Sequence, residues 1–245
     1  MRVYEGTREL RIACKHDDLL PSLREYDPHQ ETCEIECGIS VKRFCRGIEK
    51  IDLTHIEDDV RGWRILLTAD VSVAELPVEM LKKQDMVLVY RTNSEKQLAE
   101  CVRPLFSLQK REPDVGVCHP AVFCFANTDA AKEFIRFIGW QMLADVQVID
   151  INFDDVIKAF ASQRGRILCI SKKMLIPQEE LSTKDAEVQG VLFIFRGDEQ
   201  LSMFEVCGQA EKLCSSFHES TNIIWTIEMC HERSVTALLA KRLSD

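Results

Sequence analysis

Closely spaced glycines are missing from this chain, and their absence bears on nucleotide binding. Ten glycines are spread over 245 residues, and the nearest pair, Gly190 and Gly197, is seven positions apart. A phosphate-cradling loop needs clustered glycines, because its backbone must approach the anion closely and adopt positive φ angles. The sequence therefore contains neither a Walker loop nor a G-x-G-x-x-G fingerprint. The ordinary means of binding a nucleotide is absent.

An excess of positive charge and long apolar runs are also missing. Forty acidic residues face 31 basic ones, for a net charge of −9, which disfavours capture of nucleic acid or anionic lipid. No run reaches the roughly 18 apolar residues of a spanning helix, and residues 1–18 lack the apolar stretch of a signal peptide. A hydrophobic content of 46% is enough for a packed core. We expect a cytoplasmic globular protein that has no transmembrane segment and binds no nucleic acid.

Familiar catalytic motifs are absent as well. The chain has no G-x-S-x-G, no H-E-x-x-H and no kinase loop. Its six histidines are dispersed, without the i, i+4 pairing of a helical metal site. The acidic run at 57–59 could hold a cation, but a solvated turn before a strand explains it better. These patterns point away from hydrolases, metalloproteases and kinases.

Cysteine is plentiful, with eleven residues in the chain. A long chain with an ordinary core does not need a disulfide framework, so we expect reduced thiols that are partly buried. Neither of two candidate zinc sets contains the paired C-x-x-C knuckles of a typical zinc site. The sets are Cys33, Cys37 and Cys45 with His29, and Cys118, His119 and Cys124. We expect no bound metal, and a thiol- or zinc-responsive regulator built on the first set is an alternative interpretation.

Hydrophobic periodicity predicts alternating strands and helices in the first 147 residues. Short apolar runs and stretches of helical spacing follow one another, separated by turn and capping residues. The expected strands lie at 9–14, 33–41, 64–69, 85–90 and 115–125, and the expected helices at 73–83, 94–106 and 128–143. Residues 64–90 form a β-α-β unit in this interpretation. The region is therefore interpreted as an α/β domain.

A second alternation covers residues 148–245. Asn152 is placed to cap a helix, and Ser202-x-x-Glu205 is a capping box before another. The second helix carries an apolar stripe of Met203, Val206, Cys207, Ala210, Leu213, Cys214 and Phe217. The expected strands lie at 166–171, 190–195, 222–227 and 234–240, with a polar linker at 172–189 that holds at most a short helix. We expect a smaller α+β domain with a four-stranded sheet.

Several motifs, in order, resemble FtsZ, the bacterial tubulin homologue. The C-terminal domain of that family has a strand G-V-L-x-x-I-x-G, a helix with L-x-E-V-x-x-A, and strands N-I-I-x-G and V-T-x-x-A. This chain has GVLFIFRG at 190–197, then the helix from Ser202, NIIW at 222–225 and SVTA at 234–237. Three upstream stretches of this chain are also similar to the family. Residues 85–89 resemble the strand before its glycine-rich signature, and residues 114–120 resemble its T-V-x-V-V-T-K-P strand. Residues 150–156, DINFDDV, look like its synergy loop, N-x-D-F-A-D-V. The similarity covers roughly residues 80–245 and implies a tubulin/FtsZ-like fold with a reduced Rossmann-like N-terminal domain.

The chain departs from the family where the family performs its chemistry. In place of G-G-G-T-G-T-G stands RTNSEK, so the degenerate nucleotide loop comprises Arg91, Thr92, Asn93, Ser94 and Lys96. In the synergy-loop-like segment of Asp150, Asn152, Asp154 and Asp155, an aspartate replaces the family's asparagine and an asparagine replaces its first aspartate. An amide cannot act as a base, so only Asp155 keeps a catalytic type of carboxylate. Alternatively, Asp150, Asn152 and Asp155 simply favour a helix start through capping and the macrodipole.

The resemblance implies a non-catalytic pseudo-GTPase that acts through protein–protein contact, with itself or with FtsZ, in cell division. The family assembles head to tail, in open-ended filaments. A chain that keeps the synergy-loop face but lacks a working nucleotide face is expected to cap or modulate such a filament, without a cofactor. The alternative is a divergent GTP-binding, polymerising GTPase that uses Thr92, Asn93, Ser94 and Lys96 in place of the glycines.

Overall fold

The computed structural model describes residues 4–14, 31–36, 39–50, 62–111, 118–144, 149, 151–175 and 187–243. The acidic run at 57–59, the boundary between residues 147 and 148, and Asp150 lie outside the described residues. Side chains are described for only a few positions of the first three strands. None of the described helices is long and apolar enough to cross a bilayer.

Ten of the described strands form one mixed sheet, in the order β11-β10-β12-β9-β8-β5-β4-β1-β3-β2. The N-terminal strands are β1 (Tyr4–Cys14), β2 (Glu31–Glu36), β3 (Ile39–Lys50), β4 (Gly62–Ala69), β5 (Met86–Tyr90) and β8 (Ala121–Phe125). The C-terminal strands are β9 (Leu168–Leu175), β10 (Val188–Gly197), β11 (Asn222–Met229) and β12 (Ser234–Arg242). The four C-terminal strands are neighbours, as expected, and two residue pairs join β9 to β8.

Parallel pairing dominates the centre of this sheet. Strand β4 pairs in parallel with β1 and β5, and β5 pairs in parallel with β8. Between β4 and β5 the chain forms the 3-10 helix η2 (Asp70–Glu75) and the helix α1 (Val78–Lys82). The β-α-β interpretation of this region is confirmed. All carboxyl ends of these strands point to one edge of the sheet, which is where ligands bind in many α/β proteins.

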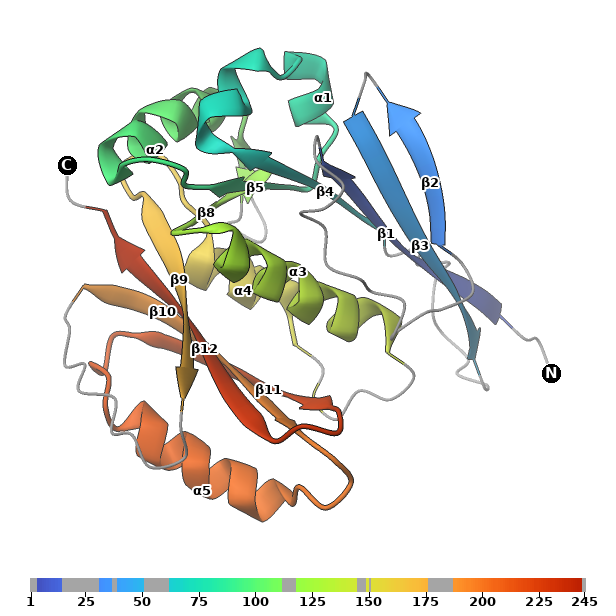
Figure 1. Ribbon diagram of the computed structural model, residues 1–245, viewed down its shortest axis with the longest axis vertical. Coiled ribbons are helices and arrows are strands. Elements are labelled where there is room, and N and C mark those ends of the chain that lie inside the picture. Colours follow the sequence, from blue (N-terminus) through green and yellow to red (C-terminus); the bar gives the residue numbers. More distant parts are fainter. Residues whose placement is uncertain are drawn as a thin grey trace.

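Helices cover both faces of the sheet (Figure 1). Helix α2 (Glu95–Val102) continues into the 3-10 helix η3 (Arg103–Ser107), and its residues Leu98 and Val102 pack with α1 on one face. Helices α3 (Thr128–Leu143) and α4 (Phe153–Phe160) pack on the other face, and α5 (Met203–Cys214) covers the outer side of the C-terminal strands. Figure 1 shows α3 running between the N-terminal and C-terminal strands.

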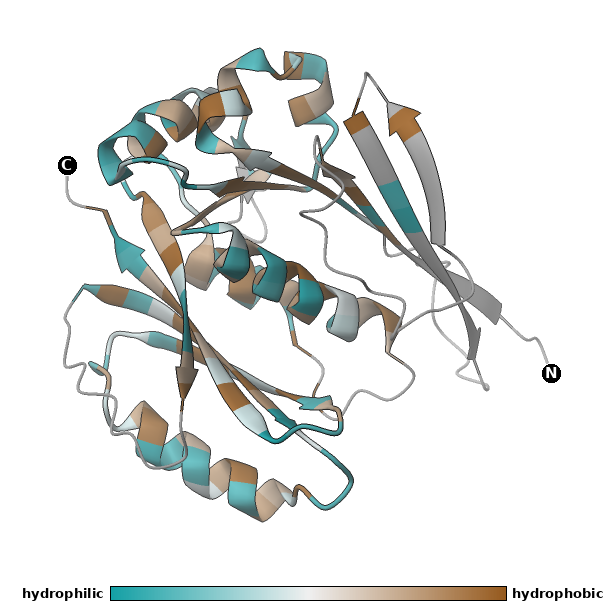
Figure 2. Ribbon diagram, in the orientation of Figure 1, coloured by the Kyte–Doolittle hydropathy of each residue, from teal (hydrophilic) through white to brown (hydrophobic). Residues whose placement is uncertain are grey.

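Strand β10 illustrates how the sequence produces two packed faces. Leu192 and Ile194 belong to the core shared with α3 and α4, whereas Val191, Phe193 and Phe195 belong to the core under α5. Successive side chains of a strand point to opposite faces, so a strand buried on both sides is a continuous apolar run. The brown colour of the central strands in Figure 2 follows this pattern.

Helix boundaries were predicted well where a cap fixes them. Helix α3 spans 128–143 as expected, and Asn127 accepts a hydrogen bond from the Ala130 amide at 2.9 Å. The capping box of α5 is present, with Ser202 accepting from the Glu205 amide at 3.2 Å and Glu205 accepting from the Ser202 amide at 3.0 Å. Its buried face is narrower than the predicted stripe, because Met203 and Cys207 are exposed.

Three expectations for the strands were wrong. The predicted strand at 33–41 is divided between β2 and β3, which pair with each other in antiparallel orientation. The predicted strand at 115–125 is interrupted at Pro120, which cannot donate to a strand ladder, so β8 begins at Ala121 and the short β7 (Cys118–His119) pairs separately with β6 (Lys110–Arg111). The predicted polar linker at 172–189 is partly strand. Strand β9 continues to Leu175 because it pairs with β12 over its whole length, and β10 already begins at Val188.

Candidate functional site

The loop that follows β5 is tied to the end of β4. Asp70 directly follows β4, and its Oδ1 accepts hydrogen bonds from the Thr92 amide at 3.2 Å, the Thr92 hydroxyl and the Val71 amide at 2.8 Å. Asp70 is fully buried, and its Oδ2 has no hydrogen-bond partner among the described residues. The loop backbone therefore turns toward a carboxylate.

The start of α2 is capped by a side chain of the loop itself. Ser94 caps the helix, because its hydroxyl accepts a hydrogen bond from the Gln97 amide at 3.2 Å. Glu95 lies in the first turn, where its negative charge suits the helix dipole, and it forms an ion pair of 2.9 Å with Arg91. Asn93 and Lys96 are exposed. All five residues of the predicted degenerate loop thus lie together at the carboxyl end of β5.

The synergy-loop-like segment forms the start of α4. Asn152 is the N-cap, as predicted, and its Oδ1 accepts from the Asp154 amide at 3.0 Å. Asp154 and Asp155 occupy the first turn, which agrees with the capping and dipole interpretation. Asp155 is exposed and lies 3.8 Å from the Lys158 ammonium group.

The two predicted sites lie at opposite ends of the parallel strands. Phe153, the first residue of α4, contacts Trp63 near the start of β4, with ring centroids 5.1 Å apart. Asp70 and Thr92 lie at the other end, where Ala69 pairs with Tyr90. At about 3.3 Å per residue, the seven residues from Trp63 to Asp70 separate the sites by about 20 Å. One face of the molecule thus carries the start of α4, and the opposite face carries the loop after β5.

Metal binding finds no support among the described side chains, where no cluster of histidine, cysteine and acidic residues could hold an ion. The side chains of Cys33, Cys37 and Cys45 lie outside the described part. Cys124, from the second predicted set, is buried, and its Sγ lies 3.4 Å from the Ser162 hydroxyl. Burial raises the pKa of the Cys124 thiol to about 12, despite the lowering effect of the hydrogen bond between Cys124 and Ser162. A thiol in this environment is inert.

A buried charge cluster between α3 and the C-terminal strands was not predicted. Arg196 of β10 donates to Glu133 of α3, to Glu228 of β11 at 2.7 Å and to Thr236 of β12 at 3.0 Å. Lys172 of β9 lies 2.8 Å from Glu133. Although burial alone would raise the pKa of Glu133, the charges and hydrogen bonds of Arg196 and Lys172 hold it below its ordinary value. The only sign of this cluster in the sequence is Arg196, a charged residue that ends the apolar run of β10. The spacing of residues along the chain could not identify the partners of Arg196.

Comparisons with known proteins concern the fold. No protein-family model matches the chain, and no curated protein matches its sequence. Similar solved structures include CetZ from Methanosaeta thermophila, an empty FtsZ dimer from M. jannaschii and GDP-form protofilaments of TubZ from Bacillus thuringiensis serovar israelensis. Their sequences are 13%, 15% and 8% identical to this chain, with TM-scores of 0.41, 0.37 and 0.42.

The matched part covers 74%, 73% and 73% of this chain, but only 62%, 54% and 60% of CetZ, FtsZ and TubZ respectively. The chain therefore spans less than two thirds of the length of these structures. The likeness is one of fold alone: the matched part shares the mixed α/β arrangement of these structures.

Proposed function

We propose that this chain is a non-catalytic FtsZ/tubulin-like protein that acts through protein–protein contact, and that it caps or modulates FtsZ-type filaments in cell division. The single observation that carries this proposal is the hydrogen bonding of Thr92 to the buried carboxylate of Asp70.

The hydrogen bonds between Thr92 and Asp70 disfavour phosphate binding at the loop after β5. A phosphate cradle offers unpaired backbone N–H groups to the anion, but the Thr92 amide already donates to Asp70. The carboxylate also places a negative charge directly behind the loop, and like charges repel strongly where water is excluded. The Gln97 amide at the start of α2 likewise donates to the Ser94 hydroxyl, and Glu95 adds a second negative charge there. The positive charges of Arg91 and Lys96 offset this only in part, because Arg91 is paired with Glu95.

The opposite face supports a role in contacts between subunits. Asp155 is exposed at the start of α4, in the segment that resembles the family's synergy loop. In a head-to-tail filament this face docks onto the nucleotide face of the next subunit. A subunit that offers only the first face binds one filament end and leaves no site for the following subunit. It therefore acts as a cap.

The experiment is a sedimentation assay of FtsZ from the same organism, assembled with GTP in the presence of this protein. We expect less sedimented polymer and shorter filaments as the protein approaches equal concentration. Unchanged polymer amount and length at equal concentrations would contradict the proposal.

Two charge reversals locate the contact. Asp155→Lys changes the exposed carboxylate at the start of α4, and we expect it to abolish the effect on FtsZ. Glu211→Lys makes the same change on the exposed side of α5, which packs on a different part of the sheet, and we expect it to retain the effect. Equal loss in both variants would mean that the net charge, rather than this face, is responsible.

A further inference from the structure

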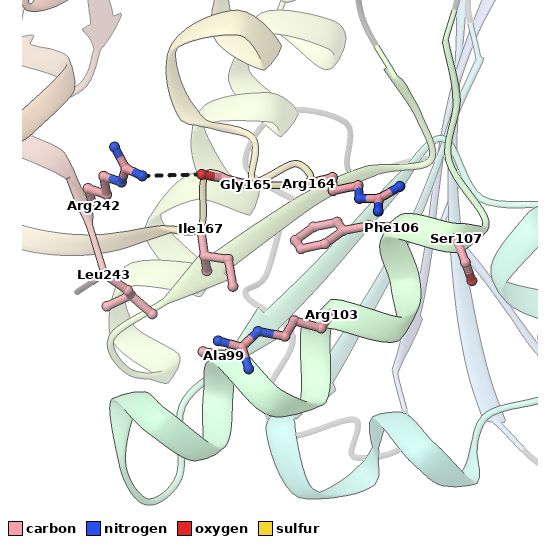
Figure 3. A pocket seen from close by; sticks show the side chains of 9 residues that line it. All are labelled: Ala99, Arg103, Phe106, Ser107, Arg164, Gly165, Ile167, Arg242 and Leu243. Carbon is pink, nitrogen blue, oxygen red and sulfur yellow. Dashed lines mark hydrogen bonds between the residues drawn. The ribbon is translucent and has the colours of Figure 1, made fainter. Parts of the chain in front are cut away.

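A pocket of about 430 Å³ lies beside the end of β12, but its polar groups do not converge. Figure 3 shows the lining residues, which come from α2 with η3, from residues 164–167 and from the end of β12. The guanidinium groups of Arg103, Arg164 and Arg242 lie at separate edges, with apolar side chains between them. Arg242 donates to the Gly165 carbonyl oxygen at 3.3 Å. The pocket by itself therefore indicates no ligand.

Strand β11 forms one end of the ten-stranded sheet and pairs only with β10 among the described strands. An edge strand presents backbone N–H and C=O groups that can pair with another chain, and proteins protect such edges with proline, lysine or a covering element. The sequence of β11, NIIWTIEM, contains neither proline nor lysine. Its one charged residue, Glu228, is buried against Arg196 of β10 and does not protect the edge.

The strand register shows which backbone groups of β11 face away from the sheet. The Cys230 amide, just beyond the strand, donates to the Gly197 carbonyl oxygen of β10 at 2.8 Å. Successive residues of a strand direct their N–H and C=O groups to opposite sides, so the even-numbered residues of β11 face β10 and the odd-numbered ones face outward. The outward groups belong to Ile223, Trp225, Ile227 and Met229.

Helix α3 covers the second half of this edge and leaves the first half open. The indole N–H of Trp140 donates to the Ile227 carbonyl oxygen at 3.1 Å, and residues 226–228 are buried. Ile223 and Trp225 are half-buried, and their outward N–H and C=O groups have no partner among the described residues. Two donors and two acceptors are thus free on one short stretch of strand.

These four groups match those of a second copy of the same strand. When two β11 strands run antiparallel about a two-fold axis at Ile224, Ile223 of each copy lies opposite Trp225 of the other. Each of these pairs exchanges two hydrogen bonds, so this one register satisfies all four groups in both copies. The pairing ends before Ile227, whose carbonyl oxygen already accepts from Trp140. A longer unrelated strand would meet the covered part of the edge at that point.

The side chains are self-complementary in this register as well. Ile224 packs with the core under α3 and α4, whereas Ile223 and Trp225 pack with the core under α5. Residues that lie opposite each other in an antiparallel pair point to the same face. Ile224 therefore meets Ile224 of the second copy on one face, and Ile223 meets Trp225 on the other. Pairs of an aromatic with a β-branched side chain stabilise antiparallel strands.

We propose that the outer edge of β11 pairs with β11 of a second copy of this chain, in antiparallel register about Ile224, so that the two sheets join into one. One short strand from each copy makes a contact smaller than a standard stable interface of about 1,200 to 2,000 Å². The dimer is therefore weak, with a dissociation constant of about 10 to 100 µM. The inference goes beyond the proposed function and uses none of its residues.

Sedimentation velocity of the protein from about 5 to 500 µM brackets this dissociation constant. Matched substitutions at one position separate backbone pairing from side-chain packing. Ile223→Pro removes an outward N–H and leaves the ladder with β10 intact, since proline is tolerated where a strand N–H faces outward. Ile223→Ala truncates the same side chain but keeps the N–H. We expect the alanine variant to dimerise a few-fold more weakly, and the proline variant at least about tenfold more weakly still, because two hydrogen bonds are lost across the two-fold axis.

A cross-link tests the register without the proline variant. The two Ile224 residues form a non-hydrogen-bonded pair with Cα atoms about 4.5 Å apart, which a disulfide can bridge. We expect Ile224→Cys to give a covalent dimer with oxidised glutathione, above the background that the native cysteines give in the unchanged protein. Asn222→Cys is the control. Its two thiols lie four residues out of register, about 13 Å apart along the strands and beyond the reach of a disulfide.

A monomer at every concentration would overturn the inference, even if an unrelated strand peptide bound the edge. Circular dichroism shows whether Ile223→Pro is folded. A dimer that this folded variant leaves intact would place the contact on another face, such as that of the exposed Phe204 on α5. Equal losses in the proline and alanine variants would exclude backbone pairing. As much covalent dimer in Asn222→Cys as in Ile224→Cys would contradict the register, and this comparison decides alone if Ile223→Pro does not fold.

Discussion

Asp70 accepts hydrogen bonds from both the amide and the hydroxyl of Thr92, across the ends of two neighbouring parallel strands. This edge of the sheet is where α/β proteins commonly bind phosphate groups. Here a buried carboxylate accepts hydrogen bonds from two donors of the loop. Under the proposed function the loop is a structural connection, which would account for the missing glycines.

Removing the carboxylate tests this structural role. In Asp70→Ala, the Val71 amide and both Thr92 donors lose their acceptor, so we expect the free energy of unfolding to fall by about 1 to 3 kcal/mol. Urea denaturation measures the change. Glu79→Ala is the control, since it removes an exposed carboxylate that pairs with Lys82 at 3.1 Å, and we expect a loss below about 0.5 kcal/mol. Equal effects of the two substitutions would contradict a structural role for Asp70.

The charge cluster under α3 should be far more sensitive than a surface ion pair. Glu133→Gln removes one of the two carboxylates that pair with buried Arg196 and leaves Glu228 in place. Removing the sole partner of a buried charge costs about 3 to 5 kcal/mol, so we expect a loss of up to about 3 kcal/mol here. The exposed pair of Glu95 with Arg91 offers the comparison, because Glu95→Gln should cost no more than about 1 kcal/mol. Thermal or urea unfolding of both variants measures the two losses in the free energy of unfolding. A loss for Glu133→Gln no larger than that for Glu95→Gln would show that the cluster does not stabilise the fold.

The same cluster predicts a pH dependence. The pKa of Glu133 is lowered in the folded protein from an ordinary value of 4.5, so its stabilisation is present above that value and is lost as the pH falls through the folded pKa. We expect the stability gap between the unchanged protein and Glu133→Gln to be constant near neutrality and to narrow below the ordinary value. A gap that widens on acidification would contradict the sign of this shift.

Two glycines should respond oppositely to alanine. A Cβ on Gly190 would lie 2.6 Å from the Ala159 carbonyl oxygen of α4, so Gly190→Ala must push the helix from the strand and should cost about 1 to 3 kcal/mol. Gly208 lies within α5 with nothing within 4 Å of its Cβ, so Gly208→Ala should gain about 0.5 to 1 kcal/mol. Denaturation curves of the pair test whether α4 packs against β10 as closely as described.

Features set by local chemistry were predictable from the sequence. Caps at Asn152 and Ser202 and the helix at 128–143 follow from hydrogen bonding and spacing within a few residues. The polar end of β9 was missed because Lys172 and Lys173 are held in the strand by pairing with β12, more than sixty residues away.

Features built from distant residues could not be predicted in this way. Asp70 lies 22 positions from Thr92, and nothing in its spacing marks it as a partner. The opposite placement of the two predicted sites likewise depends on strand direction, which the motifs themselves do not give.

The most direct test of the central claim is a calorimetric titration of the protein with GTP in the presence of magnesium. We predict no saturable heat, because the Thr92 amide and hydroxyl already donate to Asp70 and the Gln97 amide already donates to Ser94. Saturable micromolar binding that disappears in Lys96→Ala would contradict the account and identify the loop as a working nucleotide site.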